Sequence, residues 1–136
     1  MYKSLAGVLL LGLASWPLHA RAASACAPDN GGITLPAGFC ASVFADYLGT
    51  ARHLVVNGNG DVYVALQQPE HDGGIAALRD TDGDGRADVI RYFGEWGGTG
   101  IAIHDGYLYF ATNTEVMRYR LVSGELVPRS APQTVV

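Results

Sequence analysis

The sequence predicts an all-β fold formed by the first two blades of a β-propeller. Two observations favour this fold. Short β-branched and aromatic runs alternate with turn residues from residue 39 onward, and one strand-turn-strand pattern recurs at an offset of 47 and then 46 residues. No helical period of useful length occurs after the N-terminal segment. Because one blade cannot bury both faces of its sheet, such units stack around a central axis.

Residues 1–22 are predicted to form a secretory signal peptide. Lys3 provides a positive charge, residues 5–13 are apolar, and Ala20-Arg21-Ala22 fits a small-residue cleavage site. The apolar run is too short to cross a bilayer of about 30 Å, and no later run of about 20 apolar residues follows. The sequence therefore predicts an exported, periplasmic protein with no membrane span.

The charge of the exported part argues against two classes of partner. Without residues 1–22, seven Arg side chains and thirteen carboxylates remain, which gives a formal charge of −6. Nucleic acids and anionic lipids both require a positively charged protein surface. We therefore expect no nucleic-acid partner.

An extended lead-in is predicted over residues 23–38, which are small, polar and interrupted by Pro and Gly. Cys26 lies in it and Cys40 follows it. In an oxidising compartment this even pair favours a disulfide that closes the lead-in onto the first strand. The alternative is a lipid anchor at Cys26, because the residues 23–26 (ASAC) resemble a lipobox, although Ala23 replaces the usual Leu. Acylation would leave Cys40 unpaired.

The partial propeller domain is predicted over residues 39–136, with blade repeats near 52–97 and 98–136. Strands are expected at 42–47, 53–56, 62–66, 75–78, 89–93, 101–103, 108–111 and 116–121. In the aligned segments 54–65 and 101–111, an apolar strand leads through an Asn/Asp-Gly turn into a Tyr-containing strand that ends in Ala.

The number of repeats predicts that the chain is cut short. Propellers close with about four to eight blades, and two blades would expose a whole sheet face. Residues 131–136 are typical of a connection that enters a further strand. A complete eight-stranded sandwich is the alternative.

The acidic loop at residues 80–88 is the most specific chemical motif in the sequence. Carboxylates at loop positions 1, 3, 5 and 9, with Gly at position 6, are how EF-hand-like loops gather oxygens around Ca²⁺. Arg91 occupies position 12, where a complete EF-hand has Glu. The predicted ligands are Asp80, Asp82, Asp84, the backbone carbonyl of Arg86, and Asp88 directly or through water. The alternative is a solvated turn that satisfies its own backbone.

Six motifs occur in order along residues 35–122. They are LPAGF (35–39), ARHL (51–54), NGDVYV (59–64), LRDTDGDGRAD (78–88), GTGIA (98–102) and GYLYF (106–110). In this order they resemble the N-terminal part of the sorbosone dehydrogenase-like branch of the soluble quinoprotein sugar dehydrogenases, which depend on pyrroloquinoline quinone (PQQ).

The resemblance implies a six-bladed propeller that holds PQQ near its axis and oxidises an aldose or a sugar aldehyde such as sorbosone. Hydride would pass to the quinone and then to an electron acceptor, with a calcium ion at the quinone and a His as general base. None of His53, His71 and His104 has a carboxylate at a spacing that would orient it as that base. The base is therefore expected beyond Val136.

Glu95 and Trp96 are the candidate substrate contacts. Related sugar dehydrogenases place a polar substrate-contacting side chain shortly before a Gly-Gly pair, which here is Gly97-Gly98. Trp96 would stack on a sugar and Glu95 would form hydrogen bonds, whereas an aromatic plug at the propeller end is the structural alternative. The competing functions are a non-catalytic exported propeller that binds a partner or glycan, and an inactive truncated product.

Overall fold

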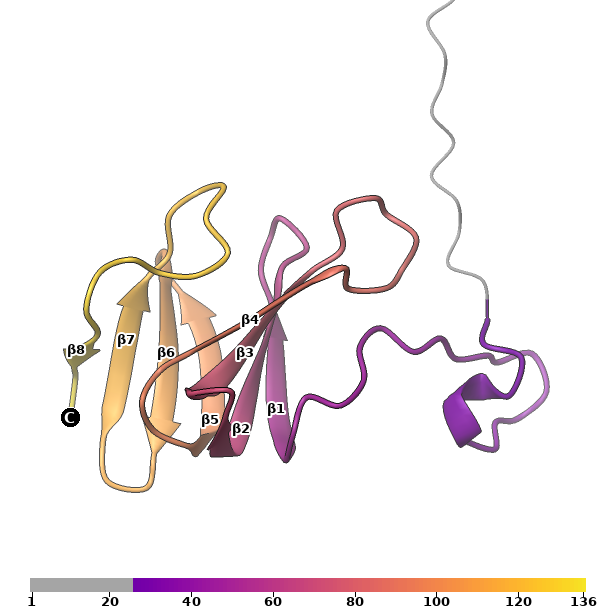
Figure 1. Ribbon diagram of the computed structural model, residues 1–136, viewed down its shortest axis with the longest axis horizontal. Helices are drawn as coiled ribbons and strands as arrows, with labels where there is room; N and C mark the ends of the chain where they lie inside the picture. The colour runs from indigo at the N-terminus through magenta and orange to yellow at the C-terminus, as the bar shows by residue number, and fades with distance from the viewer. Residues whose placement is uncertain (1–25) are drawn as a thin grey trace, which may run out of the picture.

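The computed structural model describes residues 26–136, so the predicted signal peptide at 1–22 lies outside the described residues. The described chain forms two four-stranded antiparallel sheets, and its helical structure is one 3₁₀ turn, η1 (Asn30–Gly32). Figure 1 shows the sheets side by side, with η1 far from both. The all-β prediction is confirmed.

Each sheet consists of strands that follow one another in the chain. The first sheet contains β1 (Ala51–Val56), β2 (Val62–Glu70), β3 (Gly73–Arg79) and β4 (Val89–Phe93). The second contains β5 (Gly98–His104), β6 (Tyr107–Thr112), β7 (Val116–Arg120) and β8 (Gln133–Thr134). Each of the two aligned sequence segments forms the first hairpin of one sheet.

Tight turns join the strands where the sequence places Asp-Gly pairs. The β5–β6 turn has positive φ at Asp105 (47°) and Gly106 (76°). The β2–β3 turn likewise has positive φ at His71 (47°) and Asp72 (65°). Two successive residues of positive φ give the turn whose twist matches that of the flanking strands.

The predicted strand at 42–47 is absent. This segment crosses the outer face of the first sheet, where Phe44, Ala45 and Leu48 pack against a buried cluster that contains Val64 and Leu66. The carbonyl oxygen of Phe44 accepts a hydrogen bond of 2.8 Å from the amide of Ala87. The apolar pattern that suggested a strand instead serves to cover the sheet.

The C-terminal segment also differs from its prediction as a connection into a further strand. Residues Gln133–Thr134 form β8, which pairs with Arg118 and Met117 of β7 and completes the second sheet. Val116 continues this pairing, because its amide donates to the Val136 oxygen at 2.7 Å.

A disulfide joins Cys26 and Cys40, whose Cα atoms lie 5.6 Å apart. The amide of Ala27 donates to the Ala41 oxygen at 2.7 Å, which brings the ends of the loop together. The disulfide closes the lead-in on itself and not onto the first strand, because β1 begins only at Ala51.

The two sheets pack face to face around one main core. Its buried members are Tyr63, Ala65, Ile75 and Ala77 of the first sheet, Leu108, Phe110, Met117 and Tyr119 of the second, and Leu126. Phe93 joins the two halves through edge-to-face contacts, with ring centroids 6.3 Å from Tyr63 and 5.2 Å from Tyr119. Such aromatic pairs stabilise a core beyond their buried area.

The packing is front to back. Tyr63 in β2 faces the second sheet, whereas its counterpart in the sequence repeat, Tyr109 in β6, alternates with the inward-facing Leu108 and Phe110. Side chains of opposite parity on a strand point to opposite faces. The face of the second sheet that contacts the first sheet is therefore not the one that carries the counterpart of Tyr63. Both sheets keep the same orientation along the repeat, so the outward face of the second sheet corresponds to the inward face of the first.

A buried ion pair links the turns of the first sheet to the second. Asp61 is 1% exposed and accepts hydrogen bonds from Nε and Nη2 of Arg79 at 2.6 and 2.7 Å. Arg79 Nη1 also donates to the Gly124 oxygen at 3.3 Å, and the Tyr63 hydroxyl donates to the Leu126 oxygen at 3.0 Å. The segment that follows β7 is thus held by two side chains of the first sheet.

The ion pair and the burial change two pKa values in opposite directions. The hydrogen bond from Arg79 lowers the pKa of Asp61, although desolvation acts against it and Asn59 adds a second hydrogen bond. Burial, helped by the charge of Asp61, raises the pKa of Tyr63 to about 12. Stability from Asp61 is therefore present above its ordinary pKa of 3.8 and lost as the pH falls through its lower folded value.

We predict that Asp61→Asn lowers the free energy of unfolding by about 3 kcal/mol near neutral pH, because it leaves Arg79 without its buried partner. Urea unfolding measures this loss. Acid unfolding should also change, because the variant lacks the Asp61 part of the stability lost below pH 3.8. Asp46→Asn, at an exposed carboxylate, is the control. Equal stability of the two variants would contradict a structural role for the ion pair.

We also predict that non-reduced protein contains the Cys26–Cys40 disulfide. Trypsin leaves both cysteines in one peptide, because no Lys or Arg lies between Arg21 and Arg52. Mass spectrometry should therefore find this peptide lighter by two hydrogens before reduction than after it. A free thiol on Cys40 together with a diacylglycerol on Cys26 would instead establish the lipid anchor.

Candidate functional site

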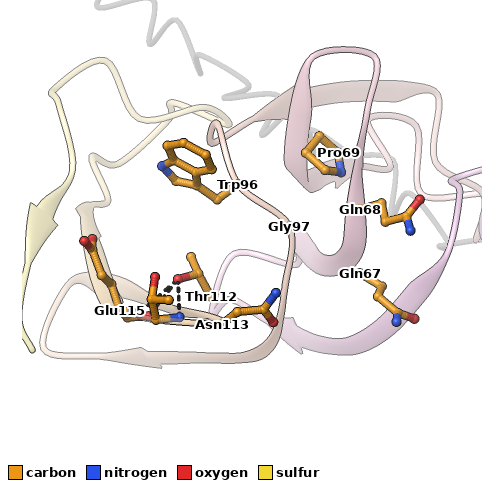
Figure 2. A pocket seen from close by; sticks show the side chains of 9 residues that line it. Gln67, Gln68, Pro69, Trp96, Gly97, Thr112, Asn113 and Glu115 are labelled. Atoms are coloured by element: carbon orange, nitrogen blue, oxygen red, sulfur yellow. Dashed lines mark hydrogen bonds between the residues drawn. The ribbon is translucent and has the colours of Figure 1, made fainter.

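A cleft of about 570 Å³ lies where the two sheets meet at one end. Figure 2 shows side chains from three segments around it: the end of β2, the loop before β5 and the turn between β6 and β7. Its lining comprises Gln67, Gln68, Pro69, Trp96, Gly97, Thr112, Asn113, Thr114 and Glu115. Such a volume is within the range of small-molecule sites.

Two glycines set the position of the Trp96 loop. A methyl group on Gly74 would overlap the carbonyl oxygen of Trp96, and one on Gly97 would overlap that of Gln67. The loop backbone therefore lies directly on β2 and β3, and the indole of Trp96, which is 59% exposed, remains at the cleft. Close approach of this kind is a position that only Gly can fill.

The opposite wall is fixed by a side-chain hydroxyl. Thr112 Oγ1 accepts hydrogen bonds from the amides of Thr114 and Glu115 at 3.3 and 3.1 Å. Its hydroxyl donates to the backbone carbonyl oxygen of Glu115 at 3.2 Å (Figure 2). These bonds hold the β6–β7 turn that carries Asn113 and Glu115. The cleft thus combines one aromatic face with amide and carboxylate groups, which suits a polyol ligand.

The structure separates the two predicted substrate contacts. Trp96 lines the main cleft and an adjoining hollow of about 300 Å³, whereas Glu95 lines only the hollow. Glu95 lies near Tyr119, whose pKa is raised first by burial and then by the Glu95 charge. Gln67, Asn113 and Glu115 were not predicted, although they occupy the same cleft as Trp96.

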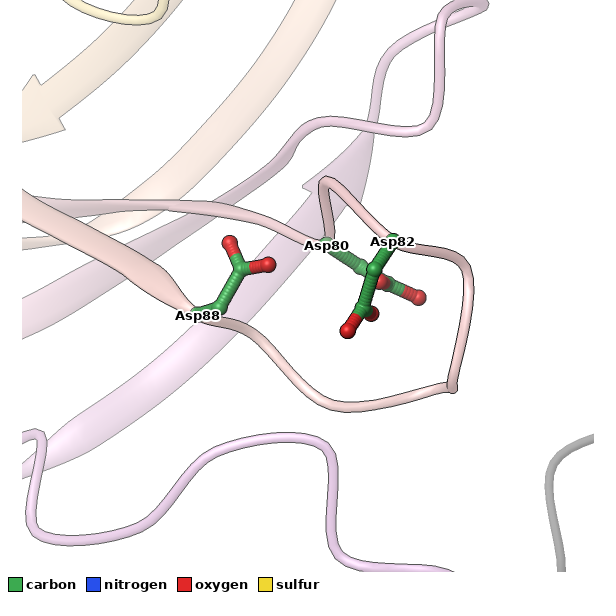
Figure 3. Close-up of side chains that lie close together, drawn as sticks. All are labelled: Asp80, Asp82 and Asp88. Carbon is green, nitrogen blue, oxygen red and sulfur yellow. The ribbon is translucent and has the colours of Figure 1, made fainter.

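The acidic loop lies at the opposite end of the first sheet from the cleft, because it joins β3 to β4 whereas the cleft includes the end of β2. Figure 3 shows Asp80, Asp82 and Asp88 together. One carboxylate oxygen of each lies within 4.8 Å of the others. Asp84 is not in this group, and its Oδ1 accepts a hydrogen bond of 2.7 Å from the Arg86 amide.

The carboxylates of the loop also organise its backbone. Asp80 accepts hydrogen bonds from the amides of Gly83 and Gly85 at 2.7 and 2.9 Å. The bond from Gly85 is the main cause that lowers the pKa of Asp80. Asp88 Oδ2 accepts bonds from the amide and hydroxyl of Thr81. The loop is thus ordered by its own carboxylates and keeps three of them close together.

None of the three histidines in the described chain lines the cleft. His53 Nδ1 lies 2.6 Å from the backbone carbonyl oxygen of Thr99, and this contact links β1 to β5. The His71 ring packs against Tyr92 with centroids 4.8 Å apart, and His104 lies 3.2 Å from Asp105 on the surface. Each imidazole has a local partner away from the cleft.

The chain matches no protein-family model, no curated protein and no solved structure. Within residues 26–136, no helix has the length and apolar character needed to cross a membrane.

Proposed function

We propose that the chain forms the first two blades of an exported, periplasmic six-bladed propeller, and that this propeller is a PQQ-dependent dehydrogenase of aldoses or sugar aldehydes such as sorbosone. The observation that carries the proposal is the front-to-back packing of two repeated four-stranded sheets with a Trp-containing cleft at their shared end. Successive propeller blades pack in this way, and their loops form the ligand sites.

The cleft supports a sugar as ligand. The indole of Trp96 offers an apolar face for the C–H groups of a sugar ring, and Gln67, Asn113 and Glu115 offer hydrogen-bond donors and acceptors for its hydroxyls. The Glu115 carboxylate is the single charged group in the lining, which favours a neutral ligand over an acidic one.

The residues around this cleft do not fit PQQ itself. PQQ carries three carboxylates and needs cations or a metal ion to balance them, whereas the lining contains no Lys, Arg or His. In the proposed enzyme the cofactor contacts and the general base belong to other blades, and these two blades contribute the sugar contacts.

A second candidate is a non-catalytic exported propeller that binds a glycan or a partner through the same cleft. It is favoured by the same absence of cations and imidazoles from the cleft within the described residues. A purified native protein that reduces a dye with an aldose and PQQ would be the enzyme. Sugar binding without PQQ-dependent reduction would identify the binder.

We predict that aldoses bind this chain with a Kd on the order of 1 mM, about 4 kcal/mol. In protein without the predicted signal peptide Trp96 is the single Trp, so its fluorescence should report binding directly. In saturation-transfer NMR, Trp96→Ala should lose the sugar signal. Tyr47→Ala, which removes an aromatic ring that is 96% exposed and outside the cleft, should retain it.

Absence of any fluorescence response to aldoses would overturn the sugar proposal. With PQQ and calcium supplied, the 136-residue chain alone should not reduce a dye, because its cleft contains no imidazole and no cation. Dye reduction by the purified chain would contradict the assignment of the cofactor contacts to other blades.

We further propose that the acidic loop binds Ca²⁺ as a structural ion, with Asp80, Asp82 and Asp88 as side-chain ligands. The support is the convergence of their oxygens within 4.8 Å on one ordered hairpin. Hard oxygen ligands of this kind are those that Ca²⁺ prefers, and the lack of a Glu at position 12 predicts a weak site, with a Kd of about 10⁻⁴ to 10⁻³ M.

We predict that millimolar Ca²⁺ raises the melting temperature of the chain, because the ion would bind the folded hairpin and not the unfolded chain. Asp82→Asn with Asp88→Asn should abolish this rise. Asp84→Asn is the matched control, because Asp84 lies outside the group of converging oxygens. Differential scanning calorimetry measures the shift. An equal response of all three proteins would leave the loop as a solvated acidic turn.

A further inference from the structure

Two apolar surfaces on opposite sides of the molecule are left uncovered by residues 26–136. On the outer face of the first sheet, Leu54 and Val56 of β1 are 62% and 57% exposed. They lie on the same face as their register partners Val64 and Val62. The covering segment at 44–48 packs against the buried cluster that contains Val64 and leaves Leu54 and Val56 more than half exposed. A strip along β1 therefore remains open.

The sequence repeat shows what this strip is built to contact. The alignment that pairs residues 54–56 with 101–103 makes Leu54 the counterpart of Ile101, and Val56 the counterpart of Ile103. Both isoleucines are partly buried, because they pack against the core that the first sheet provides. Leu54 and Val56 thus occupy the positions that Ile101 and Ile103 use to contact the neighbouring sheet. Within residues 26–136 no sheet covers Leu54 and Val56 in the same way.

The second open surface lies on the outer face of the second sheet and corresponds to the surface that Ile101 and Ile103 contact within the chain. Val55, Tyr63 and Ala65 of the first sheet face the second sheet and contact its core. Their counterparts in the repeat are Ala102, Tyr109 and Ala111. These three lie on the outer face of the second sheet and, with Gly100 and Val116, line a shallow hollow of about 220 Å³.

We propose that these two surfaces bind one another between copies of this chain. Leu54 and Val56 of one copy would enter the hollow at Tyr109 and Ala111 of the next. This repeats the part of the intrachain contact that Ile101 and Ile103 make, because residues 44–48 cover the neighbouring part of the first sheet's outer face. The inference concerns this chain by itself and rests on sheet packing alone, because in the longer propeller proposed above the neighbouring blades would cover the same two surfaces. The interface joins unlike surfaces, so it leads to a ring or an open chain of copies. Because propellers contain about four to eight blades, a closed ring would contain about two to four copies.

The first test is the mass of the purified chain without the predicted signal peptide, residues 23–136, in light scattering across a concentration series. Wild-type protein should form assemblies larger than one copy. Leu54→Ser with Val56→Ser should weaken association by more than about tenfold, which corresponds to at least 1.4 kcal/mol. Val122→Ser, at another exposed Val outside both surfaces, should associate as the wild type does. A wild-type monomer at every concentration would overturn the proposal.

A mixing experiment tests the head-to-tail geometry. One variant carries Leu54→Asp and Val56→Asp, and the other carries Ala111→Arg, so each retains one intact surface. Each variant alone should be monomeric, and the mixture should give a one-to-one heterodimer, because the two remaining surfaces are complementary. Failure of the mixture to associate would overturn the pairing of these surfaces, provided that circular dichroism shows both variants folded.

Discussion

The arrangement of the two sheets depends on the neutralisation of a single buried carboxylate. Asp61 is almost fully removed from solvent, and an unpaired charge at such a position costs several kcal/mol. Its pairing with Arg79 brings together the first hairpin and the end of β3. The same guanidinium donates to the Gly124 oxygen, so the group that neutralises Asp61 in the first sheet also orients the connection between β7 and β8 of the second sheet.

The molecule separates its two chemically distinctive features. The cleft with Trp96 lies where the sheets adjoin, whereas the acidic loop extends from the opposite end of the first sheet. Antiparallel strands make this separation inevitable, since alternate connections lie at opposite ends. An ion in the loop would stabilise the β3–β4 hairpin without contact to a ligand in the cleft. The electrostatics of the two ends can therefore be considered independently.

Much of the fold could be predicted from the sequence because its signals are local. Alternating apolar residues and Asp-Gly turns identified seven of the eight strands, and the repeat identified both sheets. The segment at 42–47 misled the prediction, because an apolar run that covers a sheet has the composition of a strand within one. The clustering of Asp80, Asp82 and Asp88 followed from their spacing, whereas the turning of Asp84 toward its own backbone depends on loop geometry.

The cleft was less predictable, because Gln67, Asn113 and Glu115 belong to no motif and meet only when the sheets stack. The contact between the Trp96 carbonyl and Gly74 means that main-chain atoms fix where the Trp96 loop lies against the first sheet. Exposed side chains of the lining, such as Gln67 and Asn113, can therefore be exchanged without moving this loop. Because Gln67, Asn113 and Glu115 are exposed and lie outside the core, this edge of the molecule is a suitable starting point for the design of a binding site.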